Sequence, residues 1–156
     1  MKTSGLCLQD TYAPNSICFG CGPANKEGLQ LKSYAANDRV ITHFQPKTHH
    51  HAFGNFLSGG VIGAILDCHC NWTGLCFAMR EQNLKTPPYT VTSQFTVKFL
   101  RPTPMEKTLL LSGKLEKIEN NKIYVYGELI ANEKVTATCD AIFAVVKEGH
   151  PGFHRW

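Results

Sequence analysis

One stretch of the chain restricts the possible folds more than any other. Residues 59–80 contain no proline and are long enough for a helix of about five or six turns. The other periodic segments alternate like β-strands, so the strand–helix repeat of a parallel α/β sheet is missing. The pattern predicts an α+β fold, with one long central helix wrapped by a curved antiparallel sheet of about six strands.

Turn signals separate the β-like runs. A hairpin is expected from residues 29–34 and 39–44, joined at Asn37-Asp38. Short connections usually join neighbouring strands, so a meander is expected from the later runs at 90–100, 108–118, 122–131 and 135–147. The length of 156 residues suits one domain, and we expect an irregular arm at 1–27, a core domain at 28–148 and a tail at 149–156.

Composition and charge exclude several classes of protein. The apolar share of 43% and the charged share of 18% are typical of a chain that buries a core. No apolar run approaches the roughly 18 residues of a membrane span and no signal-peptide pattern is seen, so a cytoplasmic protein without a membrane partner is expected. The 16 basic and 12 acidic residues are scattered, which argues against nucleic acid and fits a small ligand that carries phosphate.

The seven cysteines do not form the pattern of a disulfide framework. Cys68, Cys70 and Cys76 fall in the helical stretch, at spacings that favour buried thiols in a reducing compartment. Cys18 and Cys21 have the spacing of metal ligands, but no second pair follows them. A buried thiol turn is therefore favoured over zinc binding or redox chemistry.

The histidines also favour structural over metal-binding roles. His49, His50 and His51 are adjacent in a predicted loop and point in divergent directions, whereas zinc needs three or four convergent ligands. His69 falls on the apolar side of the helix, which is more typical of a hydrogen-bonded core histidine than of a base. No metal and no cofactor are expected.

The helical stretch has two unlike faces. Its apolar arc is expected to pack on the sheet. Glycines inside a helix cost roughly 0.5–1 kcal/mol each relative to alanine, so the other arc indicates close approach of a backbone or a ligand. On a wheel of 100° per residue, that arc holds only small or polar residues: Gly60, Gly63, Ala64, Asp67, Cys70, Asn71, Gly74 and Ala78.

Two features of this stretch carry chemistry. Asp67 lies among small and apolar residues, and because desolvation makes a carboxylate a stronger base, it is a candidate general base or nucleophile. The alternative is a carboxylate that only pairs with a cation or faces solvent. Gly59 and Gly60 follow Ser58 at the predicted helix start, where free amides form an anion or oxyanion site. Here the alternative is that Ser58 only caps the helix and the glycines only pack tightly.

Residues 55–67 read Asn-Phe-Leu-Ser-Gly-Gly-Val-Ile-Gly-Ala-Ile-Leu-Asp, with the acidic residue seven positions after the second glycine. Residues 18–29 and 99–102 add a Cys-Phe-Gly-Cys-Gly-Pro segment and a Phe-Leu-Arg-Pro segment. Together these segments resemble the hotdog-fold thioesterases, in particular the PaaI-like branch. The family signature has His-Gly-Gly at the helix start, so Ser58 departs from it.

The resemblance implies a hotdog fold, a homodimer that can pair into a tetramer, sites at the subunit interface and acyl-CoA thioesters as substrates. Carried over by position, Asp67 matches the family's carboxylate. Gly60, with Gly59, matches the amide that polarises the thioester carbonyl. Thr92 matches a Ser/Thr that positions water from the other subunit, and Asn71 matches a polar residue one turn after the carboxylate.

Substrate contacts are expected near the helix start and along the strand at 90–100. Arg101 and Lys98 are candidates to contact CoA phosphates, although each fits a solvated surface cation equally well. The further candidates are Asn55, Ser58 and His50. In the same strand Val91, Phe95, Val97 and Phe99 are expected to form the apolar face, which predicts that Thr92 points the opposite way.

Hydrolysis of an acyl-CoA with a small, medium or aromatic acyl group is the leading functional hypothesis. A hydratase or dehydratase acting on acyl-CoA or acyl carrier protein is the second, and such relatives usually pair a His base with the acid. A non-catalytic acyl-CoA-binding dimer is the third. A regulator would be expected to carry a DNA-reading arm, whereas residues 1–27 hold only two lysines.

Overall fold

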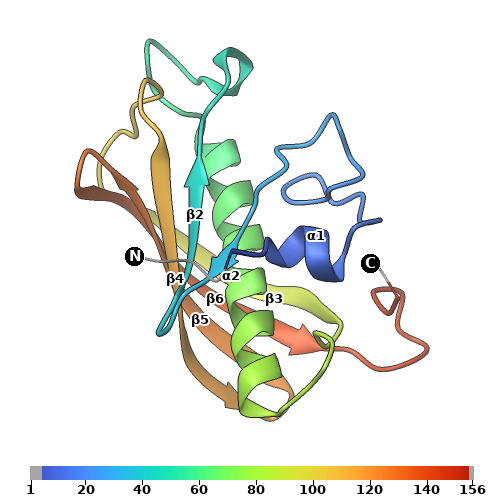
Figure 1. The fold of residues 1–156 in the computed structure, drawn as a ribbon. Coiled ribbons are helices and arrows are strands. Elements are labelled where there is room, and N and C mark those ends of the chain that lie inside the picture. The colour runs from blue at the N-terminus through green and yellow to red at the C-terminus, as the bar shows by residue number, and fades with distance from the viewer. Residues whose placement is uncertain (1–4, 155–156) are drawn as a thin grey trace.

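The computed structural model describes residues 5–154 and shows one long helix held by one six-stranded antiparallel sheet (Figure 1). This is the predicted α+β hotdog layout. The elements are α1 (Leu8–Tyr12), β1 (Tyr34–Ala35), β2 (Val40–Phe44), a 3-10 turn (Thr48–His50), α2 (Gly59–Glu81), β3 (Thr90–Phe99), β4 (Leu109–Glu119), β5 (Lys122–Ala131) and β6 (Lys134–Val145).

Helix α2 and strands β3–β6 lie where the sequence predicts them, to within two residues at each end. The first strand of the predicted hairpin is wrong in length, because β1 holds only Tyr34 and Ala35. The segment before it pairs with the arm instead: the amides of Leu29 and Leu31 donate to the carbonyls of Phe19 and Gly20, at 2.8 and 3.0 Å.

The order of the strands is β1-β2-β4-β5-β6-β3, so the predicted meander is correct only for β4, β5 and β6. Strand β3 pairs with β6 and forms the far edge of the sheet. Residues 100–108, which connect β3 to β4, include Pro102 and Pro104 and pass over the start of α2, where the Leu57 amide donates to the Thr103 carbonyl at 2.9 Å. This long, proline-containing connection does not form a tight hairpin.

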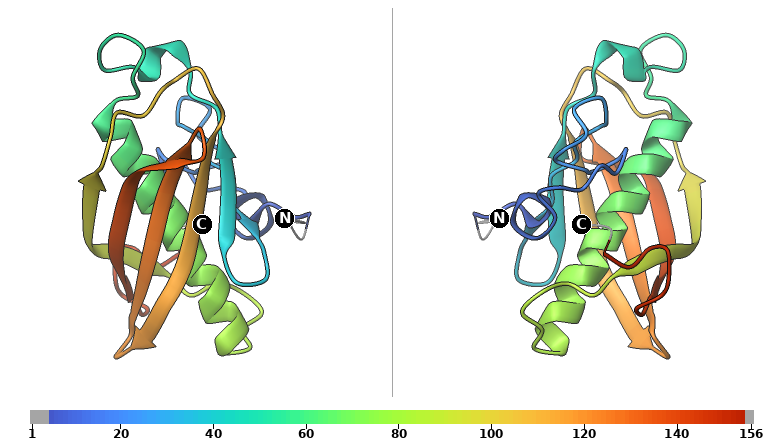
Figure 2. Two further views of the ribbon diagram at one scale, coloured as in Figure 1. Left: turned by 90° about the vertical axis from the view of Figure 1, so that its left-hand side faces the viewer. Right: turned by 90° about the vertical axis from the view of Figure 1, so that its right-hand side faces the viewer.

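The arm is more ordered than predicted. It contains the short helix α1, and its residues Leu8, Ala13 and Cys21 belong to the buried core. Figure 2 shows α1 beside the strand β2 side of the molecule. The tail folds back onto the start of β3, where the Tyr89 hydroxyl lies 3.2 Å from Nδ1 of His154.

The curved sheet and the arm bury most of α2. By length and composition alone this helix would pass as a membrane span, but 72% of its most apolar window is buried inside the fold, as expected for a core helix. The apolar arc packs on the sheet through Leu66, near Gly127 of β5. Gly74, from the small arc, also packs on β5, against Ile123 and Val125. Residues of both arcs therefore pack against β5.

Candidate active site

Helix α2 begins at the surface with its first turn uncovered. Gly59 and Gly60 are exposed, and a Cβ added to Gly60 would meet only Ser58 Oγ, at 3.7 Å. Ser58 occupies the N-cap position but its side chain makes no capping hydrogen bond within the described chain. The backbone amides of the first turn have no carbonyl acceptor within the helix. They can therefore donate hydrogen bonds to an anion or to a developing oxyanion.

Asp67 lies about two turns further along α2, half-buried, next to strand β3. The hydroxyl of Thr92 donates a hydrogen bond to Oδ1 of Asp67, with an O···O distance of 2.8 Å. The predicted orientation of Thr92, away from the helix, is therefore wrong.

A β-bulge explains the orientation of Thr92. Between Thr92 and Gln94 the pairing of β3 with β6 shifts by one residue, which leaves Ser93 extra and changes the alternation of side chains. Thr92 pairs with the buried Phe143 on the helix side of the sheet. The three polar residues at 92–94 interrupt the apolar alternation, and this interruption is the signal in the sequence that indicates the bulge.

After the bulge, two aromatic side chains of β3 turn toward the glycines of α2. Atom Cζ of Phe99 would lie 3.5 Å from a Cβ placed on Gly59, and Cε2 of Phe95 would lie 3.9 Å from one placed on Gly63. The two phenylalanines are nevertheless 58% and 42% exposed. The alternation in the sequence predicts both on the apolar face of the strand, but it does not indicate that they line the open half of the helix.

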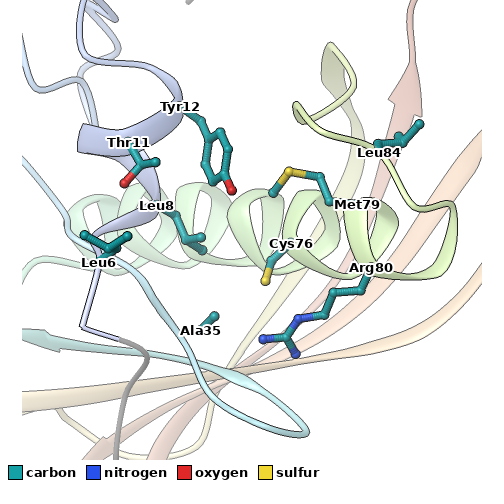
Figure 3. A pocket seen from close by; sticks show the side chains of 9 residues that line it. All are labelled: Leu6, Leu8, Thr11, Tyr12, Ala35, Cys76, Met79, Arg80 and Leu84. Atoms are coloured by element: carbon teal, nitrogen blue, oxygen red, sulfur yellow. The ribbon is translucent and has the colours of Figure 1, made fainter.

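A cavity of about 430 Å³ adjoins the start of α2. Gly59, Ile62 and Phe99 form part of its wall, and Arg101 also lines it. A second cavity, of about 340 Å³, lies near the other end of α2, where Tyr12 and Leu8 face Met79 (Figure 3). The first cavity includes Gly59 at the helix start and the second does not, so the first is the candidate substrate pocket.

Three predicted substrate contacts surround the helix start. Arg101 lines the cavity while its Nη1 donates to the Val135 carbonyl at 2.7 Å. The Ser58 amide donates to the His50 carbonyl at 2.9 Å, which fixes the entry of the chain into α2. The side-chain amide of Asn55 donates to the Glu106 carboxylate, which joins this loop to the connection after β3.

His50 lies inside this loop instead of lining a cavity. It is buried and stacked on Phe44, with ring centroids 5.8 Å apart. Its Nδ1 accepts the amide of Lys47 at 3.1 Å. Burial lowers the pKa of His50, with smaller contributions from His49 and Lys47. These contacts give His50 a structural role in the loop.

Two predicted site residues are not brought to the helix start. Lys98 lies on the face of the sheet opposite to α2, because its neighbours Val97 and Phe99 pair with the core residues Cys139 and Ala137. Asn71 is buried, and its Oδ1 accepts a hydrogen bond from the Thr90 hydroxyl at 2.7 Å. It holds the first residue of β3 to α2.

His69 is the hydrogen-bonded core histidine that the sequence predicts. Its Nε2–H donates to the Val40 carbonyl at 3.1 Å, and its Nδ1 lies 3.0 Å from the Thr42 hydroxyl and 3.2 Å from that of Ser33. Complete burial lowers its pKa to about 4. His69 is therefore neutral at pH 7 and has partners for both ring nitrogens.

No protein-family model matches the sequence, and no curated protein matches it. Among solved structures, a thioesterase superfamily protein from Shewanella loihica PV-4 is 30% identical, with a TM-score of 0.65, and the match covers 80% of this chain and 98% of that one. The Escherichia coli PaaI protein from the phenylacetic acid degradation operon is 16% identical, with a TM-score of 0.60 and coverage of 76% and 81%. A Streptococcus mutans protein bound to acetyl-CoA is also 16% identical, with a TM-score of 0.62 and coverage of 74% and 88%.

The PaaI and Streptococcus mutans proteins establish a shared fold. The Shewanella protein goes further, because its 30% identity extends over almost its whole length. The layout of one long helix against a six-stranded antiparallel sheet agrees with that match. This chain belongs to the thioesterase superfamily.

Proposed function

We propose that this protein is an acyl-CoA thioesterase, which hydrolyses its substrate to a free acid and CoA. The observation that carries the proposal is the hydrogen bond from Thr92 to Asp67, on the same helix that exposes the amides of Gly59 and Gly60. Thioester hydrolysis needs a base to activate water and donors to stabilise the developing oxyanion. A carboxylate and helix-start amides supply these two functions.

The two groups do not reach one carbonyl within one chain. Gly60 and Asp67 are seven residues apart, which is about 10 Å along an α-helix. A general base acts within hydrogen-bond reach of the attacking water, which itself lies roughly 3 Å from the carbonyl carbon. The proposed site therefore combines the helix start of one copy with Asp67 of a second copy.

Strand β3 is the surface that we assign to this dimer. It is an edge strand of ten residues, and long unprotected edges are normally covered or blunted. It also exposes Phe95 and Phe99, and Leu100 just after the strand is exposed as well; a second copy would cover these side chains. Pairing through this edge brings the open half of each α2 toward the other copy.

In the proposed reaction, Asp67 removes a proton from water as the water oxygen attacks the thioester carbonyl carbon. The amides of Gly60 and Gly59 stabilise the oxyanion, and CoA leaves as the C–S bond breaks and its sulfur is protonated. Thr92 donates to Oδ1 of Asp67, which orients the carboxylate that receives the proton. In the alternative, Asp67 attacks the carbonyl carbon, CoA leaves and a mixed anhydride forms. Attack of ¹⁸O-labelled water on the Asp67 carboxyl carbon of that anhydride would place ¹⁸O in Asp67.

The cavity beside Gly59 is proposed to hold the acyl group, since Phe99 and Ile62 are apolar. Arg101 is proposed to contact a CoA phosphate near this opening. The acetyl-CoA bound to the Streptococcus mutans neighbour supports a ligand of this class. The seven free cysteines support a reducing compartment, which we propose is the cytoplasm.

The test is release of free CoA from a panel of acyl-CoAs, measured with a thiol reagent. Asp67→Asn is expected to lower kcat by about 10²–10⁴-fold while the fold is kept. Asp140→Asn, on the exposed side of β6, is the matched control and should leave kcat unchanged. If no acyl-CoA is hydrolysed but one is bound, the protein is a non-catalytic acyl-CoA-binding dimer.

Mixed dimers test the shared site. Gly60→Pro lacks the amide hydrogen of the proposed oxyanion site. In a dimer of Asp67→Asn and Gly60→Pro chains, a shared site leaves one of the two sites intact, so about half of the wild-type activity should return. A site contained within one chain would give no recovery, because each chain would carry one defect.

A further inference from the structure

We infer that Cys18, Cys21 and Cys68 form a binding site for a zinc ion, which fastens the N-terminal arm to helix α2. The three sulfur atoms lie within 4.8 Å of one another, although Cys68 is 50 residues from Cys18 in sequence. This site is separate from the proposed catalytic chemistry, and neither depends on the other.

The spacing of the sulfurs suits metal coordination better than a disulfide bond. The Sγ atoms of Cys18 and Cys68 are 3.7 Å apart. In a tetrahedral site with Zn–S bonds of about 2.3 Å, neighbouring sulfurs lie about 3.8 Å apart. A disulfide would require about 2 Å and would use only two of the three thiols. Thiolates are ligands that zinc favours.

The backbone around the cysteines is built to bring them together. A Cβ on Gly20 would lie 2.4 Å from the Sγ of Cys68, so glycine is required for the turn to approach α2 so closely. The amide of Gly22 donates to the carbonyl of Cys18 at 2.8 Å and closes the turn. A Cβ on Gly22 would lie 2.4 Å from the backbone nitrogen of Cys18.

Hydrogen bonds to the sulfurs form the next shell around the proposed metal. The indole N–H of Trp72 donates to the Sγ of Cys21 at 3.3 Å. Donors of this kind stabilise thiolate ligands and fix their orientation.

The site is closed on one side and open on the other. Cys21 and Cys68 are 7% and 8% exposed, whereas Cys18 is half-buried. Three protein sulfurs leave one tetrahedral position, which we assign to water on the Cys18 side. Each thiol that binds the ion releases its proton, so three protons leave for each ion bound by the fully protonated cluster.

Cobalt(II) is the probe for this site, because thiolate ligation gives it charge-transfer bands and tetrahedral geometry gives it intense d–d bands. The full chain, reduced and metal-free, is titrated without oxygen. We expect these bands to saturate at one equivalent and to disappear when zinc is added. Cobalt should also quench the fluorescence of Trp72 in a Trp156→Phe background.

Matched serine variants identify the ligands. Cys18→Ser and Cys68→Ser should each weaken cobalt binding by at least about 100-fold, as expected for loss of a first-shell ligand. Cys7→Ser, in the same arm and also half-buried, and Cys76→Ser, in the same helix and also buried, should bind cobalt like the wild type. If Cys68→Ser does not fold, the half-buried Cys18 provides the decisive variant.

Three outcomes would overturn the zinc site. In the first, the reduced protein gives no thiolate-to-cobalt bands. In the second, Cys18→Ser binds cobalt as tightly as Cys7→Ser does. In the third, the reduced protein does not bind cobalt but loses two thiols on exposure to air. Two of the three cysteines would then form a disulfide bond instead of a metal site.

Discussion

The two halves of helix α2 carry the same kind of residues and meet opposite surroundings. In the first half Gly59, Gly60 and Gly63 are at least partly exposed, and Asp67 accepts a hydrogen bond from an edge strand. In the second half the small residues are buried, with Gly74 against Ile123 of β5. Small residues therefore leave room for a ligand at one end of the helix and for the sheet at the other.

The difference comes from the strands that lie opposite. Strands β4, β5 and β6 lie inside the sheet and cover the second half of α2 closely. Strand β3 is the edge, and its bulge directs Thr92, Phe95 and Phe99 toward the first half without covering it. If this comparison is correct, substitutions in the first half should change activity, and substitutions in the second half should change stability.

Among the substitutions that compare the two halves, the largest effect is expected at the open helix start. Gly60→Pro removes one amide donor and should lower kcat by about 10²–10³-fold, the usual cost of one oxyanion donor. Gly60→Ala keeps the amide, and its methyl group meets only Ser58 Oγ, so its kcat should remain close to that of the wild type. Steady-state kinetics on the folded variants measures kcat for each. Equal losses of kcat in the two variants would mean that the Gly60 amide does not stabilise the oxyanion.

The next prediction concerns the buried second half of α2 and the dependence of its stability on pH. The pKa of His69 is about 4 in the folded state and 6.5 in the reference state, so below pH 6.5 the unfolded chain binds more protons. The stabilising contribution is full above pH 6.5 and is lost as the pH falls toward 4, by about 3 kcal/mol. Urea unfolding at several pH values measures this loss.

His69→Gln should remove this contribution to the pH dependence, whereas His43→Gln, at an exposed position of β2, should keep it. Because carboxylates also titrate in this range, the informative quantity is the difference between each variant and the wild type. An unchanged slope in His69→Gln would show that this histidine is not buried neutral in solution.

Two threonines of β3 provide a sharper test, because each bonds to a different half of α2. Thr90→Val leaves the buried Oδ1 of Asn71 without its donor, which should cost about 1–3 kcal/mol of unfolding free energy while activity is kept. Thr92→Val removes an exposed hydrogen bond to Asp67, which should lower kcat roughly tenfold and change stability by less than about 0.5 kcal/mol. Denaturant melts and kcat on both variants separate the two roles, and the reverse pattern would contradict the division of the helix.

The smallest expected effects are changes in stability when two glycines of α2 are replaced by alanine. Alanine favours a helix over glycine by about 0.5–1 kcal/mol, so Gly63→Ala should be slightly stabilising, since its Cβ would make ordinary contact with Phe95 at 3.9 Å. At Gly74 the Cβ would lie 2.8 Å from Cγ2 of Ile123, and overpacking of about 1–3 kcal/mol should make Gly74→Ala a net loss of about 1 kcal/mol. Thermal unfolding gives both signs. A gain in stability together with lower activity in Gly63→Ala would indicate that substrate or a second copy comes close to this glycine.

Much of the fold was predictable because it follows from local periodicity. The proline-free helix at 59–81 and the strand at 122–131 have the boundaries that alternation, turns and the glycine start indicate, to within one residue. Asp67 and the exposed glycines were also predictable, since they are small or charged residues on one helical face. The buried, hydrogen-bonded position of His69 followed from its place on the apolar arc.

The incorrect predictions concern long-range pairing. Strand β3 was expected beside β4 but lies at the far edge beside β6. This arrangement depends on pairing between residues 38 to 55 positions apart, from Phe99–Ala137 to Thr90–Val145. One extra residue, Ser93, was enough to reverse the predicted orientation of Thr92. Asn71 shares an arc with Asp67, but its partner Thr90 is set by where β3 crosses the helix.

The sequence by itself determined the elements and the chemical groups: one helix with a glycine start, a carboxylate two turns later, and a pair of cysteines at ligand spacing. The tertiary structure decided which of these groups meet. Only the folded chain brings Thr92 to Asp67 and Cys68 to Cys18. The physical reason is that periodicity acts within a few residues, whereas strand order and bulges depend on contacts between segments that are distant in the chain.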